Sequence, residues 1–156
     1  MVESSEDILG LKKDTFYEIV KIGAIAGAVA GVITYIAGFV STMAFWGGAL
    51  MMYGGYGLGF NFGALFQGVI QQAISGAILA VVVVKFYDKF PFKTLFMKMF
   101  GISLIVNVVL GGLFAAVFSI FGAGLSFIVL MVGLIIANYV EAKMIADKVG
   151  PLTNLK

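Results

Sequence analysis

Hydrophobic and charged positions are segregated into long blocks along the chain. Charged residues occur only in three segments, at positions 1–21, 85–98 and 141–156. Between them lie two uncharged and largely apolar runs, Ile22–Val84 and Met99–Val140. A membrane-spanning helix needs about 20 predominantly apolar residues, so each run is long enough for two such helices and the turn that joins them. The pattern therefore predicts an all-α integral membrane protein with a four-transmembrane-helix bundle.

The predicted elements form one membrane domain over residues 1–156. The first outer loop begins with Trp46, an expected interfacial anchor, and it also contains apolar residues. Two conformations remain open for this loop, a surface loop and a re-entrant segment whose backbone is sheltered by the helices. We expect spans at approximately 22–45, 62–84, 99–118 and 125–142, a cytoplasmic loop at 85–98, and outer loops at 46–61 and 119–124.

The positions of the lysines predict the topology. All ten basic residues are lysines, and all lie in the three charged segments. Lysine-rich short loops mark the cytoplasmic face of a membrane. Two spans in each apolar run place every lysine on the same side, which predicts that both termini are cytoplasmic. The lysines expected to anchor the central loop at the interface are Lys85, Lys89, Lys93 and Lys98.

Residues 1–16 predict a short amphipathic helix that lies at the membrane interface. They are polar and acidic, with a loose apolar stripe at Ile8, Leu11 and Phe16. A solvated extension and a specific lipid contact are both open for this segment. Toward the other end of the sequence, Gly150-Pro151 is a typical helix stop signal and predicts the end of the last helix.

The first predicted span carries a face of small residues. Gly23, Gly27 and Gly31 recur every four residues, and residues four apart lie on the same face of a helix. Such a face lets another helix backbone approach closely in a membrane. Packing within the chain and self-association of two chains are both open interpretations of this helix-packing face.

A weak internal repeat is visible between the two apolar runs. The segment Gly76–Ala80 resembles Gly133–Ala137, and the sequence around Lys21 resembles that around Lys98. Two helical hairpins of the same orientation would form a parallel repeat, as in some transporters. Apolar composition by itself also produces such matches, so duplication and chance both remain open.

Composition sets limits on the chemistry of the chain. It is 62% hydrophobic and 12% charged, whereas soluble domains are about 45–50% apolar and about 25% charged. The absence of Cys, His and Arg excludes thiolate and imidazole metal sites, histidine acid–base catalysis and guanidinium recognition of phosphate. The sequence contains no nucleophile–base motif, phosphate loop or metal-ligand spacing, so we expect a non-catalytic protein without a cofactor or metal. A net charge of +2 is too small to indicate nucleic-acid binding.

The polar residues inside the predicted spans are almost all uncharged. Gln71 and Asn107 lie at similar depths at a helix rise of about 1.5 Å per residue, so we expect at least one glutamine to meet Asn107 or a partner chain. Interhelical hydrogen bonds and the lining of a path for a neutral solute are both open interpretations. Glu141, near the end of the last span, is expected at the membrane interface. The candidates for polar contacts are Gln67, Gln71, Gln72, Ser75, Asn107 and Asn138.

Three functions fit these features. A polar-poor helical protein with a glycine-lined face fits a non-catalytic subunit or assembly partner of a larger membrane complex, whose partners are the lipid bilayer and other membrane chains or itself. The alternative is a small homo-oligomeric channel or transporter for a neutral solute. A third hypothesis, lipid binding or membrane shaping, rests on residues 1–16 and on the alternating lysine and aromatic residues of the central loop.

Overall fold

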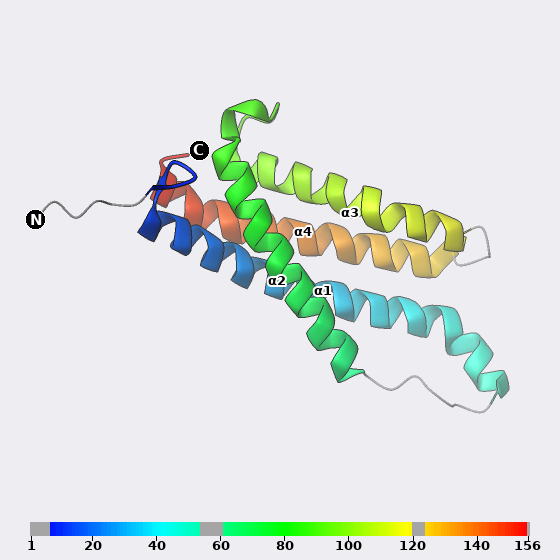
Figure 1. Cartoon of the computed structure of the whole chain (residues 1–156). Helices are drawn as coiled ribbons and strands as arrows, with labels where there is room; N and C mark the ends of the chain where they lie inside the picture. The colour runs from blue at the N-terminus through cyan, green and yellow to red at the C-terminus, as the bar shows by residue number, and fades with distance from the viewer. Residues whose placement is uncertain (1–6, 54–60, 120–123, 156) are drawn as a thin grey trace, which may run out of the picture.

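The computed structural model describes residues 7–53, 61–119 and 124–155. A short hairpin of strands β1 (Asp7–Ile8) and β2 (Leu11–Lys12) precedes the first helix, and a 3₁₀ helix, η1 (Tyr87–Lys89), follows the second. Helix dominates the described residues, so the predicted all-α class is confirmed apart from this small hairpin. The α-helices are α1 (Lys13–Tyr53), α2 (Phe62–Lys85), α3 (Leu95–Ser119) and α4 (Gly124–Thr153) (Figure 1).

Helix α1 is the centre of the arrangement. It packs against α2 on one side and against α4 on the other, and α3 packs on α4. Figure 1 shows α2 crossing α1 steeply, whereas α3 and α4 run side by side. Gly133 of α4 lies against Ala37 of α1, where an added Cβ would overlap the alanine side chain. The helices therefore form an open arrangement in which α2 makes most of its contacts with α1.

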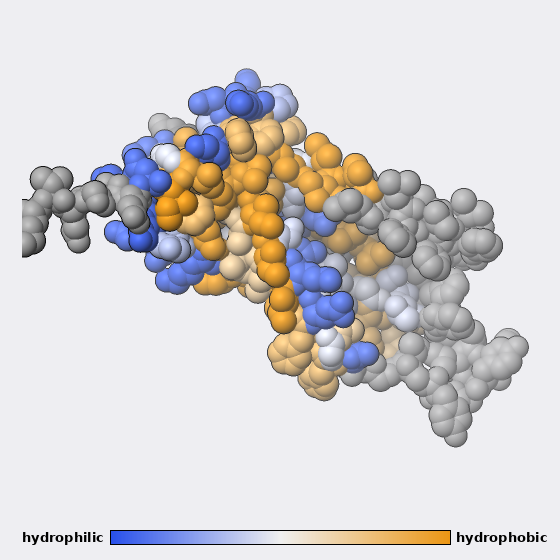
Figure 2. All heavy atoms as spheres, viewed as in Figure 1, coloured by the Kyte–Doolittle hydropathy of each residue, from blue (hydrophilic) through white to orange (hydrophobic). Residues whose placement is uncertain are grey.

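Three helices contain stretches that are long and apolar enough to cross a membrane. They are Lys13–Met43 in α1, Phe62–Lys85 in α2 and Ile128–Thr153 in α4. In α3, the apolar stretch whose side chains are described, Leu95–Asn107, is shorter. Many large apolar side chains of these helices are exposed, among them Ile70, Ile74 and Ile78 on α2. Figure 2 shows such residues as an apolar surface along α2, which is the type of surface that lipid covers.

The buried core lies at the lysine-bearing end of the molecule, where α1 begins and α4 ends (Figure 1). All four helices contribute to it, so this end holds the helices together while α2 diverges from α3 and α4 beyond it. Its largest fully buried side chains include Ile19, Val83, Leu95, Met99, Ile145 and Val149.

The predicted amphipathic helix over residues 1–16 is wrong for residues 7–12. These residues form an antiparallel hairpin, and the helix begins only at Lys13. Leu9 and Gly10, at the turn, both have positive φ, the conformation of the tight hairpin turns that favour glycine. The Lys85 ammonium group donates a hydrogen bond to the Leu9 carbonyl, a tertiary contact that no local pattern predicts. Residues 1–6 lie outside the described residues.

The ends of α1 and α2 are defined by different signals. Helix α1 continues to Tyr53, so the part of the predicted 46–61 loop up to this residue is helical. Glycine is tolerated inside membrane helices, which is why the glycines after Trp46 do not end α1. Helix α2 runs over nearly the same residues as the second predicted span, and the Asn61 side chain caps it by accepting from the Ala64 amide at 3.1 Å. Residues 54–60 lie outside the described part, so re-entry of this loop stays a prediction.

Helices α3 and α4 both extend beyond the predicted spans. Helix α3 begins inside the predicted 85–98 loop, where the Thr94 hydroxyl accepts a hydrogen bond from the Met97 amide at 3.2 Å. Helix α4 passes the Gly150-Pro151 stop signal and ends at Thr153. Pro151 lies inside the last turn, where it has no backbone N–H to donate to the carbonyl four residues earlier. The end is set by Asn154, which takes the left-handed conformation that closes many helices.

Candidate functional site

The helix-packing face of α1 lies directly on α2. A Cβ added to Gly27 would overlap the carbonyl oxygen of Gln72, and one added to Gly31 would lie 2.9 Å from the Cα of Val69. The neighbours are backbone atoms, which cannot rotate away as a side chain can. Only glycine therefore allows this approach, and the structure uses the Gly23, Gly27 and Gly31 face for packing within the chain.

The Glu141 side chain of α4 lies next to α2 at the crossing of α1 and α2. A Cβ added to Gly76 of α2 would lie 2.7 Å from the Glu141 Oε1 atom, and it would also overlap the carbonyl oxygen of Gly23. Glu141 is only 3% exposed, so its side chain is buried between the helices, and its expected depth at the membrane interface stays a prediction. Glu141 is buried because it shares the inward face of α4 with Ala137 and Ile145, which lie four residues to either side.

Four polar residues of α3 and α4 join to form what we call the polar cluster: Ser103, Asn107, Asn138 and Glu141. The Ser103 hydroxyl lies 3.1 Å from Glu141 Oε2 and also donates to Asn138 Oδ1. Asn107 Nδ2 donates to Asn138 Oδ1 at 2.7 Å. Ser103, Asn138 and Glu141 are each less than 5% exposed. Spacings of three and four residues place each pair on one face of its helix, and packing of α3 on α4 brings the two faces together.

The hydrogen bonds of the polar cluster fix the orientation of its amide groups. Asn138 Nδ2 donates to the Leu134 carbonyl of its own helix at 2.7 Å, so Asn138 Oδ1 must face α3. Ser103 then has two acceptors within reach, Asn138 Oδ1 and Glu141 Oε2. A hydroxyl group carries a single hydrogen, so Ser103 cannot donate to both acceptors at once.

No lysine among the described residues forms an ion pair with Glu141. Lys98 is buried, but its ammonium group donates to the Tyr87 carbonyl and lies 3.5 Å from the centre of the Tyr87 ring. Lys143 pairs with Asp147 at 2.8 Å, on an exposed face of α4. The contacts that the structure records for the Glu141 carboxyl group are therefore neutral ones.

The predicted interfacial lysines have different environments. Lys85 holds the hairpin turn at Leu9. Lys89 lies 5.2 Å above the centre of the Phe86 ring, and Lys93 is exposed. Lys98 is 4% exposed and holds the loop between α2 and α3 through Tyr87. The role of these lysines as anchors at the membrane interface stays a prediction. The side chain of Trp46 lies outside the described residues.

A second polar feature runs along the outer side of α2, and we call it the glutamine flank: Gln67, Gln71 and Ser75. All three residues are exposed, and neither glutamine side chain forms a hydrogen bond that the structure records within the described part. Figure 2 shows hydrophilic surface beside the apolar stripe of α2, on the side that opens toward α3 and α4. Gln72 is half-buried at the crossing with α1.

The expected contact between a glutamine and Asn107 does not occur within the described chain. Asn107 bonds instead to Asn138 and Ser103, because α3 packs on α4 and touches α2 only slightly. The glutamine flank therefore has no polar partner on α3 among the described residues. The other half of the expectation, contact with a partner chain, stays a prediction.

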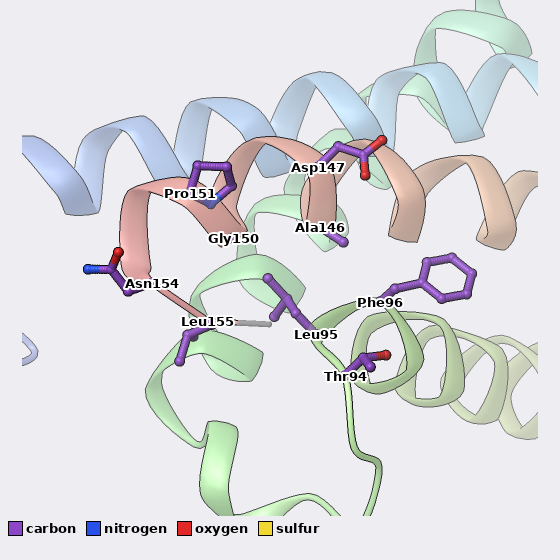
Figure 3. Close-up of a pocket in the computed structure, with 9 residues that line it drawn as sticks. All are labelled: Thr94, Leu95, Phe96, Ala146, Asp147, Gly150, Pro151, Asn154 and Leu155. Carbon is purple, nitrogen blue, oxygen red and sulfur yellow. The ribbon is translucent and has the colours of Figure 1, made fainter.

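A pocket of about 580 Å³ lies between the start of α3 and the end of α4 (Figure 3). Two of its three polar side chains are already engaged, since Thr94 caps α3 and Asp147 pairs with Lys143. Figure 3 shows that the polar ends of Thr94 and Asp147 do not converge, while Leu95 and Leu155 occupy the space between the helices. A ligand site combines an apolar wall with converging polar groups, so the polar cluster is the better candidate.

Sequence reasoning missed two members of the polar cluster as site residues, Ser103 and Glu141. The available signal was their spacing, because Ser103 lies four residues before Asn107 and Glu141 lies three residues after Asn138. The described residues contain no group of three or more Asp, Glu, His or Cys side chains that could hold a metal ion. Carboxylate, hydroxyl and amide oxygens suit protons and hard cations instead of soft metals.

Comparison with known protein families, with curated proteins and with solved structures gives no match for this chain. Its function is therefore argued from the geometry of the glutamine flank and the polar cluster.

Proposed function

We propose that the protein is a non-catalytic membrane protein that crosses the bilayer four times, with both termini in the cytoplasm. We further propose that it acts as a subunit or assembly partner of a larger membrane complex. The observation that supports this function is the glutamine flank, a line of exposed polar side chains on an otherwise apolar helix.

Contact between the glutamine flank and lipid hydrocarbon is energetically unfavourable. A polar group without a hydrogen-bond partner in the hydrocarbon region carries a penalty of several kcal/mol. From Gln67 to Ser75 the flank extends about 12 Å along α2 at about 1.5 Å per residue. Ile70 and Ile74, both 58% exposed, lie beside it. A helix from another chain would satisfy the amides and cover these apolar side chains at the same time.

The position of α2 keeps the flank available to a partner. Helix α2 is tied to α1 by the glycine crossing and by Tyr35, whose hydroxyl donates to the Asn61 carbonyl at 2.9 Å. Toward the end that carries this contact, α2 diverges from α3 and α4 (Figure 1). The flank lies on the open side of α2, so a partner helix would reach it without displacing α3 or α4.

The topology is tested with single cysteines, since the chain has none of its own. We expect a membrane-impermeant maleimide to label Gly57→Cys in intact cells. Lys89→Cys and Asn154→Cys should react only after the membrane is opened. Labelling of Gly57→Cys and Lys89→Cys from the same side would contradict four spans with both termini inside.

The assembly is tested by crosslinking from the glutamine flank in native membranes. A photoreactive maleimide attached to Gln71→Cys should crosslink a foreign membrane chain, which mass spectrometry identifies. Ile105→Cys is the matched control, because Ile105 is 56% exposed on α3, away from the flank. Equal adducts from both positions, or none from Gln71→Cys in folded protein, would contradict the proposed contact surface.

The alternative function is a small homo-oligomeric channel or transporter for a neutral solute. It is supported by the same polar flank, which would line a path if several copies turned it toward a common axis. Crosslinking from Gln71→Cys would then give only multiples of the 16.5 kDa chain. In liposomes, Gln71→Leu should abolish solute flux while leaving the folded protein intact, and unchanged flux would exclude the flank as a path.

A further inference from the structure

We propose that the polar cluster is a proton-binding site, in which Glu141 carries the proton and Ser103 and Asn138 hold it in place. This inference is independent of the proposed assembly, because it rests on α3 and α4 rather than on the glutamine flank. The ligand is a proton that enters and leaves the interior of the helical arrangement.

The first argument is that the cluster offers hydrogen-bond partners to a protonated Glu141. Asn138 Oδ1 and Glu141 Oε2 both lie within hydrogen-bond reach of the Ser103 hydroxyl, which has one hydrogen to donate. If Glu141 is protonated, its carboxyl group donates to the Ser103 oxygen, and Ser103 donates to Asn138 Oδ1. A protonated Glu141 thereby joins a continuous chain of hydrogen bonds through Ser103 to Asn138, whose Oδ1 atom also accepts from Asn107.

The second argument is the charge around Glu141 on each neighbouring element. On α1, Glu18 and Lys21 are exposed and pair with each other at 3.4 Å. Helix α2 has no charge before Lys85, which bonds to the Leu9 carbonyl. On the α3 side, Lys98 is held at the carbonyl and ring of Tyr87, while Asp88 and Lys89 of η1 are exposed. On α4 itself, Lys143 pairs with Asp147, and Lys148 is exposed.

No described cation therefore compensates a charge on Glu141. An ionised carboxylate buried at 3% exposure without a cation is strongly disfavoured in an interior of low dielectric. A bound proton removes that charge, and the Ser103 oxygen can accept a hydrogen bond from the protonated carboxyl group. The burial of the carboxyl group and the lack of a compensating cation among the described residues both favour a bound proton.

Proton binding is also linked to the position of α2. The second carboxyl oxygen, Glu141 Oε1, faces Gly76, and the carbonyl oxygen of Gly23 lies close to the same point. Loss of the proton would set a full negative charge beside this carbonyl oxygen at the crossing of α1 and α2. Two acceptors repel each other there, so release of the proton would loosen the seating of α2.

Infrared spectroscopy of the full chain in lipid bilayers tests the site. A protonated carboxyl group absorbs at a different frequency from a carboxylate, so at neutral pH the wild-type protein should show a carboxylic-acid band that Glu141→Gln lacks. Ser103→Ala should shift this band, because the hydrogen-bond partner is removed. Asp147→Asn is the matched control on the exposed side of α4 and should leave the band unchanged.

The exchange of the proton is tested in heavy water. We expect the band to shift when H₂O is replaced by D₂O, and to disappear reversibly in alkaline buffer. A wild-type spectrum without the band, or a band that persists in Glu141→Gln, would overturn the proposal. So would a band that never exchanges in D₂O, or one that is lost when sodium replaces choline at constant pH, since sodium would then be the occupant.

Discussion

Gly76 of α2 lies against the carboxyl group of Glu141 of α4, so closely that a Cβ at position 76 would be 2.7 Å from the Oε1 atom. The same glycine rests on the backbone of α1 at Gly23 and Gly27. One residue without a side chain therefore connects the glycine crossing of α1 and α2 with the polar cluster of α3 and α4. A change in one of these features is transmitted directly to the other.

Gly76→Ala should destabilise the protein through both contacts. Overpacking of a close contact lowers stability by about 1–3 kcal/mol, which exceeds the gain of up to about 1 kcal/mol from alanine in a helix. The melting temperature in detergent should fall. Gly68→Ala on the same helix is the control, because no atom lies within 4 Å of its added Cβ. An equal melting temperature for the two variants would argue against the close crossing.

Gly27→Ala should separate α1 from α2, because the added methyl group would overlap the carbonyl oxygen of Gln72. Backbone atoms can avoid the overlap only if one helix moves. We expect faster amide hydrogen exchange along α2, measured by mass spectrometry. Gly38→Ala, whose Cβ meets nothing within 4 Å, should leave the exchange unchanged. Equal protection of α2 in both variants would contradict this contact.

Asn138→Leu should lower stability because it leaves Asn107 and Ser103 without their common acceptor. Interhelical hydrogen bonds in membranes average about 0.6 kcal/mol and reach about 1.7 kcal/mol, and this residue is 1% exposed. A loss near the upper value in reversible unfolding is expected. Thr42→Val removes a hydroxyl that bonds only to its own helix at Gly38 and should cost less. A larger effect at Thr42 would show that the polar cluster contributes little.

Tyr35→Phe should release the start of α2. The Tyr35 hydroxyl donates to the Asn61 carbonyl and accepts from the Asn61 amide, both at 2.9 Å. Each lost hydrogen bond weakens the contact by about 0.5–1.5 kcal/mol. Hydrogen exchange of the first turn of α2 should become faster, while Tyr17→Phe, at an exposed position of α1, serves as the control. Unchanged protection of this turn would mean that other contacts hold it.

The order and approximate extent of the helices could be predicted from the sequence. Charges cannot lie in the hydrocarbon region without a large penalty, so their absence from Ile22–Val84 and Met99–Val140 limits where long apolar helices can run. The spacing of Gly23, Gly27 and Gly31 also identified a close-packing face, since periodicity places these residues on one side of a helix. These are local properties, and each segment carries its own signal.

The partners of those helices could not be predicted, because they depend on contacts between residues far apart in the chain. Local spacing did not show that the glycine face meets α2, or that the Lys85 side chain reaches Leu9 and supports a hairpin in place of a helix. Glu141 resembled a boundary charge because lysine and aspartate follow it in the sequence. Only the packing of α4 against α3 and the α1–α2 crossing buried its carboxyl group beside Ser103. The sequence by itself thus determined the order and approximate extent of the four α-helices, through the cost of placing charge in lipid. The tertiary structure decided which polar groups meet, because hydrogen bonds between helices require faces that only folding brings together.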